Sequence, residues 1–478
     1  MTTDQMPVVG DAEPDAGLAE TPGPDAGPSA SAQPDAAPKP LTVAEFTDNY
    51  GPQASGILYA VQLLEAEVLR AGHHVVLVAP NSDGPNPLAG REGRREIRLP
   101  SMIIPGMHTR MAMGQDFDYR LAQIVANPPD IVHIHGLGPI GLLGLWVAER
   151  TGKPLLLTWH TDFEAYAEHY WHLAPFLAAA YKMHYARIDK GWAKLNARRF
   201  SRPRRGGAQV ELLQLAASML IEANLVTTPS DKTARRVLEI APSAKVRVVP
   251  SGTDPLPERT MVPSARGPRL LYVGRIAQEK GIELLLDAFE LVRDRVPRAE
   301  LMIVGDWKNS QASLRRRLQR AARFGGVKLP GQIDRDDLGG YYASADVFVF
   351  PSLTDTQALV LHEAAQAGLP LVLVDHELRL VVDPGANAAL ARPNPVSLAG
   401  AVTEMLDALH DPVFAAAARA RSVELAAQWT VERQAKDFIE IYESLAAGRP
   451  IALTENLEPD YDRPVFPQRR VTATFEKK

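Results

Sequence analysis

Two acidic side chains flank an apolar segment in the second half of the chain. Asp355 and Glu363 stand on either side of Ala358–Leu361, in a stretch that opens with "FPS". Acids beside apolar residues need a partner, because an unpaired charge is costly to remove from water. A helix predicted to begin near Gln357 places Glu363 about two turns beyond Asp355, on the same face. The pair suits the paired hydroxyls of a sugar or ribose. The alternative is an acid that complements the helix dipole and a second, partly exposed helix acid.

Two cations stand at another predicted junction between a strand and a helix. In "VGRIAQEKG", Gly274 allows a tight turn, and Arg275 and Lys280 bracket the predicted start of the helix. A planar guanidinium, a compact ammonium and a helix dipole together favour a diphosphate. The alternative is a pair of surface cations on a solvated turn.

Two polar loops in the first half of the chain follow predicted strands. In "TDNYGPQASGI", which ends at Ile57, Gly56 precedes a predicted helix, and the loop amides are candidates to reach a phosphate. In "WHTDFEAYAEHY", His160 stands at a strand end. The residues that we assign to the acceptor side are Asp48, Tyr50, Asp162 and Tyr166.

Motifs of other enzyme classes are missing from the sequence. It contains no cysteine, no Walker A motif and no Gly-x-Ser-x-Gly elbow, and it offers no obvious Asp-x-Asp metal site. We take His133 and His135 to point to opposite faces of their strand, which makes "VHIHG" a poor metal site. We therefore predict no metal and no cofactor beyond the substrates.

Apolar β-branched runs alternate with helical patterns twice along the chain. The predicted strands before the linker include residues 72–80, 129–136, 153–160, 224–230 and 245–255; those after it include 269–275, 300–306, 346–352 and 370–375. Such alternation predicts parallel sheets with right-handed crossovers, and hence two tandem doubly wound Rossmann-like domains that face a central cleft. Ligands of these folds bind beyond the carboxyl ends of the strands.

Composition predicts a tail, two domains and a linker. Residues 1–40 hold eight prolines, seven acids and one lysine, and are predicted to be disordered. The net charge of -5 comes from this tail, so the near-neutral remainder argues against nucleic acid as a partner. We expect neither a secretory signal nor a spanning helix. The predicted boundaries are 1–40 for the tail, 41–255 for an acceptor-side domain, 256–268 for the linker, 269–430 for a nucleotide-sugar domain and 431–478 for a C-terminal helix and tail.

The motifs, in their order along the chain, resemble those of the family-4 retaining glycosyltransferases with the GT-B architecture. The resemblance covers about residues 43 to 440, from "TDNYGPQASGI" through "DIVHIHG", "WHTDF" and "YVGRIAQEKG" to "FPSLTDTQALVLHEAAQAGLP". It implies a hexosyltransferase that uses a nucleotide sugar, with UDP or GDP as the nucleotide, and needs no metal.

The resemblance also implies a role for individual residues. Asp355 and Glu363 match the two acids of the family's Glu-x7-Glu motif, which imply contacts with the donor sugar and the ribose. His160 matches a histidine beside the donor sugar. The implied catalytic residues are His160, Arg275, Lys280 and Asp355, and the implied donor-binding residues are Gly56, Gly274, Arg275, Lys280, Asp355, Thr356, Gln357 and Glu363.

Two positions depart from the family pattern. Asp355 is one methylene shorter than the usual glutamate, and Ala358 stands where the family mostly has glycine. The Cβ of Ala358 predicts a tighter donor-sugar pocket, and both changes bear on which donor is used.

A basic, aromatic insert points to the acceptor. Residues 182–205 contain nine Lys or Arg against one acid, together with Tyr185, Trp192 and Phe200. This composition suits an anionic membrane surface, and relatives with similar loops glycosylate lipids, which predicts a cytoplasmic protein peripheral to the inner membrane face. The alternatives are a solvated basic loop, a soluble acceptor such as a sugar or inositol phosphate, and a non-catalytic protein that keeps the fold.

Overall fold

The computed structural model describes most of the chain from Lys39 onward. The described residues are 39–50, 56–81, 86–103, 110–112, 117–160, 207–258, 262–263, 265–324 and 326–458. The acceptor-side candidates Asp162 and Tyr166, the basic insert and residues 1–38 of the predicted tail lie outside these ranges.

The first half of the chain forms a seven-stranded parallel sheet in the order β3-β2-β1-β6-β7-β8-β9. Aliphatic residues line both faces of the central strands, so the strands read as near-continuous apolar runs. The strands are β1 (Thr42–Phe46), β2 (His74–Pro80), β3 (Arg94–Leu99), β6 (Ile131–Ile134), β7 (Leu155–Thr158), β8 (Leu225–Thr228) and β9 (Val246–Val248), with a separate antiparallel pair β4 (Ser101–Ile103) and β5 (Arg110–Ala112).

The second half forms a six-stranded parallel sheet in the order β12-β11-β10-β13-β14-β15. Its core includes Tyr272, Phe289 and Phe348. The strands are β10 (Arg269–Val273), β11 (Glu300–Val304), β12 (Val327–Gly331), β13 (Val347–Phe350), β14 (Leu371–Leu373) and β15 (Ala388–Leu390).

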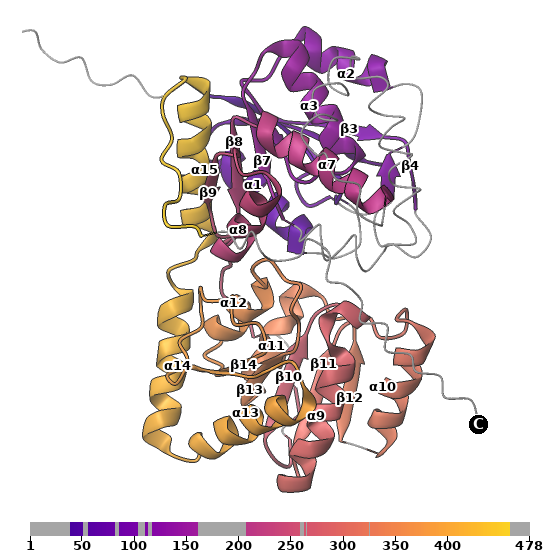
Figure 1. The fold of residues 1–478 in the computed structure, drawn as a ribbon, viewed down its shortest axis with the longest axis vertical. Coiled ribbons are helices and arrows are strands. Elements are labelled where there is room, and N and C mark those ends of the chain that lie inside the picture. The colour runs from indigo at the N-terminus through magenta and orange to yellow at the C-terminus, as the bar shows by residue number, and fades with distance from the viewer. Residues whose placement is uncertain are drawn as a thin grey trace, which may run out of the picture. The chain divides into compact units, whose positions relative to one another are not determined.

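Helices connect the strands of each sheet and lie against it (Figure 1). Those of the first half are α1 (Gly56–Arg70), α2 (Phe117–Ala126), α3 (Pro139–Thr151), α7 (Gly207–Glu222) and α8 (Asp231–Ile240). Those of the second half are α9 (Ile282–Arg295), α10 (Ala312–Phe324), α11 (Leu338–Ala343), α12 (Leu359–Gln366), α13 (Pro395–Ala408) and α14 (Pro412–Ala426), with two short 3-10 helices, η1 (Gln278–Lys280) and η2 (Arg335–Asp337).

The last helix, α15 (Val431–Ala446), belongs to the core of the first sheet although it follows the second. Its residues Phe438, Ile441 and Tyr442 are buried against Val43 and Ile131 of β1 and β6. Figure 1 shows α15, in yellow, beside β9, where Glu440 Oε1 lies 3.4 Å from Arg247 Nη1. The chain thus returns to its first sheet after completing the second.

The predicted fold class is confirmed, since the structure contains two parallel doubly wound sheets in tandem. A membrane-spanning helix needs about 18 or more mostly apolar residues, and none of the helices in the described ranges meets this requirement.

Candidate functional site

The candidate site lies where the strand order of the second sheet reverses. Strands β11 and β12 follow β10 on one side, and β13, β14 and β15 lie on the other. The connections that follow β10 and β13 therefore run to opposite faces of the sheet, which opens a crevice at the strand ends in folds of this kind. These are the two loops that carry Arg275 and Lys280, and Asp355.

A glycine brings these two loops into contact. Gly281 precedes α9 in the left-handed conformation, with φ 69°. A Cβ at this position would lie 2.4 Å from the carbonyl oxygen of Pro351, in the loop after β13. Only glycine meets both demands without strain.

Lys280 and Asp355 form an ion pair across the contact. The Nζ of Lys280 lies 2.6 Å from Oδ1 of Asp355, and their side chains are 14% and 19% exposed. The hydroxyl of Ser352 donates to the other carboxylate oxygen. Burial by itself would raise the pKa of Asp355, but Lys280, this hydrogen bond and Lys232 outweigh it and hold the pKa below its usual value. Asp355 is therefore a carboxylate at neutral pH.

Arg275 is the most accessible of the predicted charges. Its side chain is 44% exposed, and its Nη2 lies 3.0 Å from Oε1 of Glu279, one helical turn along the chain. The hydroxyl of Tyr272 donates to the backbone carbonyl of Arg275 over 2.9 Å and so fixes the turn from which the guanidinium extends.

Glu363 has partners of its own. Tyr342 donates its hydroxyl to Oε2 over 2.7 Å, and the guanidinium of Arg335 donates to Oε1. The side chain of Glu363 is 3% exposed. The carboxylate is thus held in place by two partners from other elements.

The helix that carries Glu363 begins later than predicted. We expected it to start near Gln357, but α12 begins at Leu359. Ala358 before it adopts a left-handed conformation with φ 61°, which is strained for a residue with a Cβ. The sequence resemblance predicts glycine at this position. The backbone at Ala358 has the left-handed conformation that glycine adopts at lower cost.

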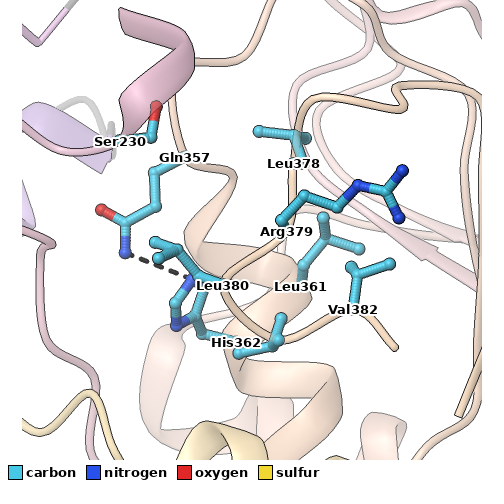
Figure 2. Close-up of a pocket in the computed structure, with 9 residues that line it drawn as sticks. Ser230, Gln357, Leu361, His362, Leu378, Arg379, Leu380 and Val382 are labelled. Carbon is cyan, nitrogen blue, oxygen red and sulfur yellow. Dashed lines mark hydrogen bonds between the residues drawn. The ribbon is translucent and has the colours of Figure 1, made fainter. Parts of the chain in front are cut away.

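Thr356 and Gln357 contact loops of the first half of the chain. The hydroxyl of Thr356 donates to the carbonyl of His160 over 3.0 Å. The amide of Gln357 makes two hydrogen bonds to the backbone of Ser251 and lies 3.2 Å from Nε2 of His362. Figure 2 shows Gln357 at the edge of a mostly apolar pocket, with this last contact dashed. In this arrangement Gln357 joins the two halves rather than presenting its amide to a ligand.

His160 lies at the end of β7, half-buried beside the loop that holds Thr356. Its Nε2 lies 3.3 Å from Nδ1 of His135. Removal from water lowers the pKa of His160 to about 4, so the imidazole is neutral at pH 7.

Gly56 opens α1 at an exposed position. A Cβ there would make only an ordinary contact, 3.9 Å from Cδ1 of Leu359. Packing within the described residues therefore does not require glycine at position 56, whereas close approach of a ligand to the backbone would.

Two family profiles match the chain in succession. The profile described as "Glycosyltransferase Family 4" matches residues 55–255, and the one described as "Glycosyl transferases group 1" matches residues 267–408. The chain belongs to the family-4 glycosyltransferases, with the GT-B architecture.

The names of two curated relatives of this glycosyltransferase indicate different substrates. The chain is 26% identical to an alpha-monoglucosyldiacylglycerol synthase of Streptococcus pneumoniae over 346 residues, or 70% of each protein. It is 28% identical to a GDP-mannose-dependent alpha-mannosyltransferase of Mycolicibacterium smegmatis over 346 residues, or 70% of this chain and 80% of the relative.

Solved structures share the fold at lower identity. Sucrose-phosphate synthase of Thermosynechococcus elongatus superimposes with a TM-score of 0.62 at 22% identity, over 85% of this chain and 100% of that one. The Anabaena protein HepE in complex with UDP-glucose superimposes with a TM-score of 0.61 at 16% identity, over 84% of this chain and 100% of that one.

In this glycosyltransferase, the acceptor-side candidates Asp48 and Tyr50 have interior partners. The Oδ1 of Asp48 accepts a hydrogen bond of 3.0 Å from the amide of Ile140 and so satisfies the start of α3. The hydroxyl of Tyr50 donates to Oε2 of Glu65 over 2.7 Å, and the ring lies under the guanidinium of Arg98. Both side chains are buried among these partners. The contact of Asp48 and Tyr50 with an acceptor stays a prediction.

Asp48 makes the stability of the glycosyltransferase depend on pH. Burial raises the pKa of Asp48 from 3.8 to about 6, although the amides of Ile140 and Gly141 oppose the shift. Because the pKa of Asp48 is higher in the folded than in the unfolded protein, protonation of Asp48 stabilises the folded state. This contribution is fully present below pH 3.8 and is lost as the pH rises through 6. Asn at this position can still accept from Ile140 but does not ionise. Between pH 4.5 and 7.5, we expect Asp48→Asn to gain about 2 kcal/mol of unfolding free energy relative to the unmutated protein.

Urea denaturation at several pH values measures this difference. Asp130→Asn is the matched control, because Asp130 accepts from the amide of Thr42 at the start of the same sheet but its side chain is 40% exposed. Parallel stability curves for Asp48→Asn and the unmutated protein would show that Asp48 titrates normally.

Sequence reasoning missed Lys232 of α8. Its Nζ donates to Oδ2 of Asp375 over 2.6 Å and to the carbonyls of Leu353 and Asp355 over 2.9 Å each. The side chain is 4% exposed. A lysine within an amphipathic helical pattern gives no signal of burial, because its partners lie more than 120 residues away.

Proposed function

We propose that this glycosyltransferase moves a hexose from a UDP- or GDP-sugar to an acceptor hydroxyl with retention of configuration at the anomeric carbon. The observation that carries the proposal is the ion pair between Lys280 and Asp355 at the switch point of the second sheet, with Arg275 on the loop that leads to Lys280. Two cations and one carboxylate there offer a diphosphate and a sugar hydroxyl their preferred partners. The HepE complex with UDP-glucose, which has the same fold, supports a nucleotide-sugar donor.

The cations act on the leaving group. As the bond between the anomeric carbon and the diphosphate oxygen breaks, negative charge grows on the diphosphate, and Arg275 and Lys280 stabilise it more than they stabilise the bound donor. The acceptor oxygen forms its bond to the anomeric carbon on the face that the diphosphate leaves. Its proton passes to the departing phosphate oxygen, so the reaction needs no protein nucleophile.

The ion pair between Lys280 and Asp355 suggests how the site responds to the donor. The two groups neutralise one another over 2.6 Å without a ligand. A bound diphosphate attracts Lys280 with more charge than one carboxylate does, which leaves Asp355 to accept hydrogen bonds from the sugar. Glu363, held by Tyr342, is the proposed partner of the ribose hydroxyls. None of these contacts calls for a metal ion.

A membrane lipid is the proposed acceptor. The pneumococcal relative is named for synthesis of a diacylglycerol glycoside. The basic residues between Lys182 and Arg205 supply positive charge that anionic lipids attract, worth about 1 kcal/mol per residue near the surface. We therefore propose that the protein works as a peripheral protein on the inner membrane face.

A thermal-shift screen followed by turnover assays tests the proposal. UDP-, GDP- and ADP-sugars are each added to the protein, and the matching one is expected to raise the melting temperature, since a ligand at 100 times its Kd adds about 2.7 kcal/mol. Sugar transfer is then followed with anionic liposomes that contain diacylglycerol or phosphatidylinositol. Turnover with liposomes supports a lipid acceptor, and equal turnover without them supports a soluble one. Binding without turnover on any acceptor would refute the enzymatic role.

A further inference from the structure

A row of buried polar side chains crosses one face of the first sheet, and the proposed mechanism uses only its last member. Strand β1 contributes Glu45, β6 contributes His133, and His135 follows β6; Thr158 of β7 continues the row, and His160 ends it. In register, Glu45 pairs with His133 and His133 with Leu156. The carboxyl group of Glu45 and the imidazoles of His133 and His135 are essentially inaccessible to solvent.

The two histidines lie on the same face, and our prediction of opposite faces was wrong. Residues two apart on a strand point to the same side, so His133 and His135 are neighbours, with ring centroids 3.9 Å apart. One ligating atom from each of Glu45, His133 and His135 lies within 4.8 Å of the others. The spacing of two residues between His133 and His135 therefore already indicated a shared face, and our prediction applied the strand periodicity incorrectly.

His133 has no ring nitrogen to spare. Its Nδ1 lies 2.8 Å from the hydroxyl of Tyr442, and its Nε2 lies 2.6 Å from Oγ1 of Thr158. Thr158 in turn lies 2.6 Å from Oγ1 of Thr227. This chain of hydrogen bonds is complete without Glu45.

Glu45 and His135 each keep an unused polar atom. Neither carboxyl oxygen of Glu45 has a hydrogen-bond partner, and neither does Nε2 of His135. The other nitrogen of His135, Nδ1, lies 3.3 Å from Nε2 of His160, and these two rings are stacked at 5.5 Å. Buried polar atoms without partners are rare because each costs desolvation energy. One ligating atom of Glu45 lies within 4.8 Å of one of His135, which makes each group the candidate partner of the other.

We propose that Glu45 and His135 are positioning residues that fix the tautomer of His160, so that His160 presents an Nδ1–H donor to the bound donor sugar. The identity of the recipient rests on the proposed function. The tautomer itself depends only on residues of this chain.

The protons can be placed one by one. Desolvation, and then the neighbouring charge of Glu65, raise the pKa of Glu45 well above its usual value, so its carboxyl group keeps a proton. This O–H donates to Nε2 of His135. The proton of His135 is then on Nδ1 and is donated to Nε2 of His160, which leaves the proton of His160 on its Nδ1. Every member of the chain is neutral, as an interior of low polarity favours.

A metal site is the competing interpretation of the same residues. One carboxylate and two imidazoles are ligands that zinc accepts, and a structural zinc site takes four ligands. Both nitrogens of His133 are already hydrogen-bonded, which leaves Glu45 and His135 as two ligands, too few to hold the ion. The hydrogen-bonded chain uses the unpaired atoms without breaking any existing contact.

Histidine NMR on the full-length protein tests the proposal without substrate. Long-range proton–nitrogen spectra of protein labelled with 15N-histidine report which nitrogen of each of the 12 histidines carries the proton, and His160→Gln assigns the signal. Glu45→Gln keeps an N–H donor toward His135, and we expect it to retain the Nδ1–H form of His160. Glu45→Leu removes the donor at similar volume, and we expect a mixture of both tautomers. Thr158→Val, which removes a partner of His133 and of Thr227 but none of Glu45, His135 or His160, is the matched control.

Kinetics and metal analysis complete the test. With a productive donor, we expect Glu45→Leu to lose about tenfold or more in kcat with little change in KM, since a wrong tautomer removes a correctly placed proton, and Glu45→Gln to restore it. An unchanged His160 tautomer in Glu45→Leu, or one zinc ion per chain in the purified protein, would overturn the proposal. If the tautomer follows Glu45 but no nucleotide sugar is turned over, the positioning chain stands and the proposed function fails.

Discussion

Replacing Lys280 by alanine is expected to lower kcat by about 10²- to 10³-fold while the protein stays folded, because one preorganised charge on a leaving group is worth about that much. The ammonium of Lys280 lies at the switch point of the second sheet, 2.6 Å from Asp355. The lysine side chain is only 14% exposed, so alanine also removes some packing, and stability is measured beside activity for this reason. Steady-state kinetics with the nucleotide sugar selected by thermal shift measure kcat, and the melting temperature reports the fold.

Two variants make this result specific. Lys280→Arg keeps the charge and should fall between alanine and the unmutated protein, because a guanidinium has a different reach and shape. Lys436→Ala removes an exposed lysine from α15 and should leave kcat unchanged. Near-normal turnover in Lys280→Ala would remove this residue from the diphosphate site.

Replacing Lys232 by methionine is expected to destabilise the protein by about 3–5 kcal/mol, because it leaves the buried carboxylate of Asp375 without its counter-ion. Both side chains of the pair are 4% exposed, and Nζ of Lys232 also donates to two carbonyls of the loop after β13. Denaturant unfolding of the purified variant measures the loss.

A double variant separates the lost pairing from lost packing. In Lys232→Met/Asp375→Leu both charges are gone, and apolar replacement of a buried pair is often neutral, so most of the stability should return. Arg235→Met/Glu377→Leu serves as the control, because that pair lies at the surface with side chains 31% and 41% exposed. A loss below about 1 kcal/mol in Lys232→Met would mean that water or another group compensates Asp375.

The sequence was sufficient for the architecture and for the loops that meet at the switch point. Strands of a parallel sheet are buried on both faces, so β10 and β13 appear as uninterrupted apolar runs that end at a loop. Since all such loops leave at one edge, Arg275, Lys280 and Asp355 could be grouped before any coordinates. Strand β3 was missed for the opposite reason. Its arginines look exposed in the sequence, yet Arg94 is buried by an ion pair with Glu65, which lies 29 residues earlier.

The partners of individual side chains could not be predicted. Glu363 is held by Tyr342 and Arg335, and nothing in its local sequence indicates that either residue approaches it. Asp48 occupies the start of α3, which begins about 90 residues further along. Contacts of this range depend on how whole elements pack, whereas periodicity and turn chemistry report only on neighbouring residues.

The return of α15 to the first sheet sets an order of events during synthesis. Tyr442 closes a hydrogen bond to His133 across 309 positions of sequence, and Phe438 and Ile441 fill the same core. A ribosome must therefore translate as far as α15 before the first sheet can bury its last apolar surface. Until then that surface is open to chaperones and to other nascent chains. A truncation before Val431 would leave the surface open permanently, so the two halves of this glycosyltransferase mature together.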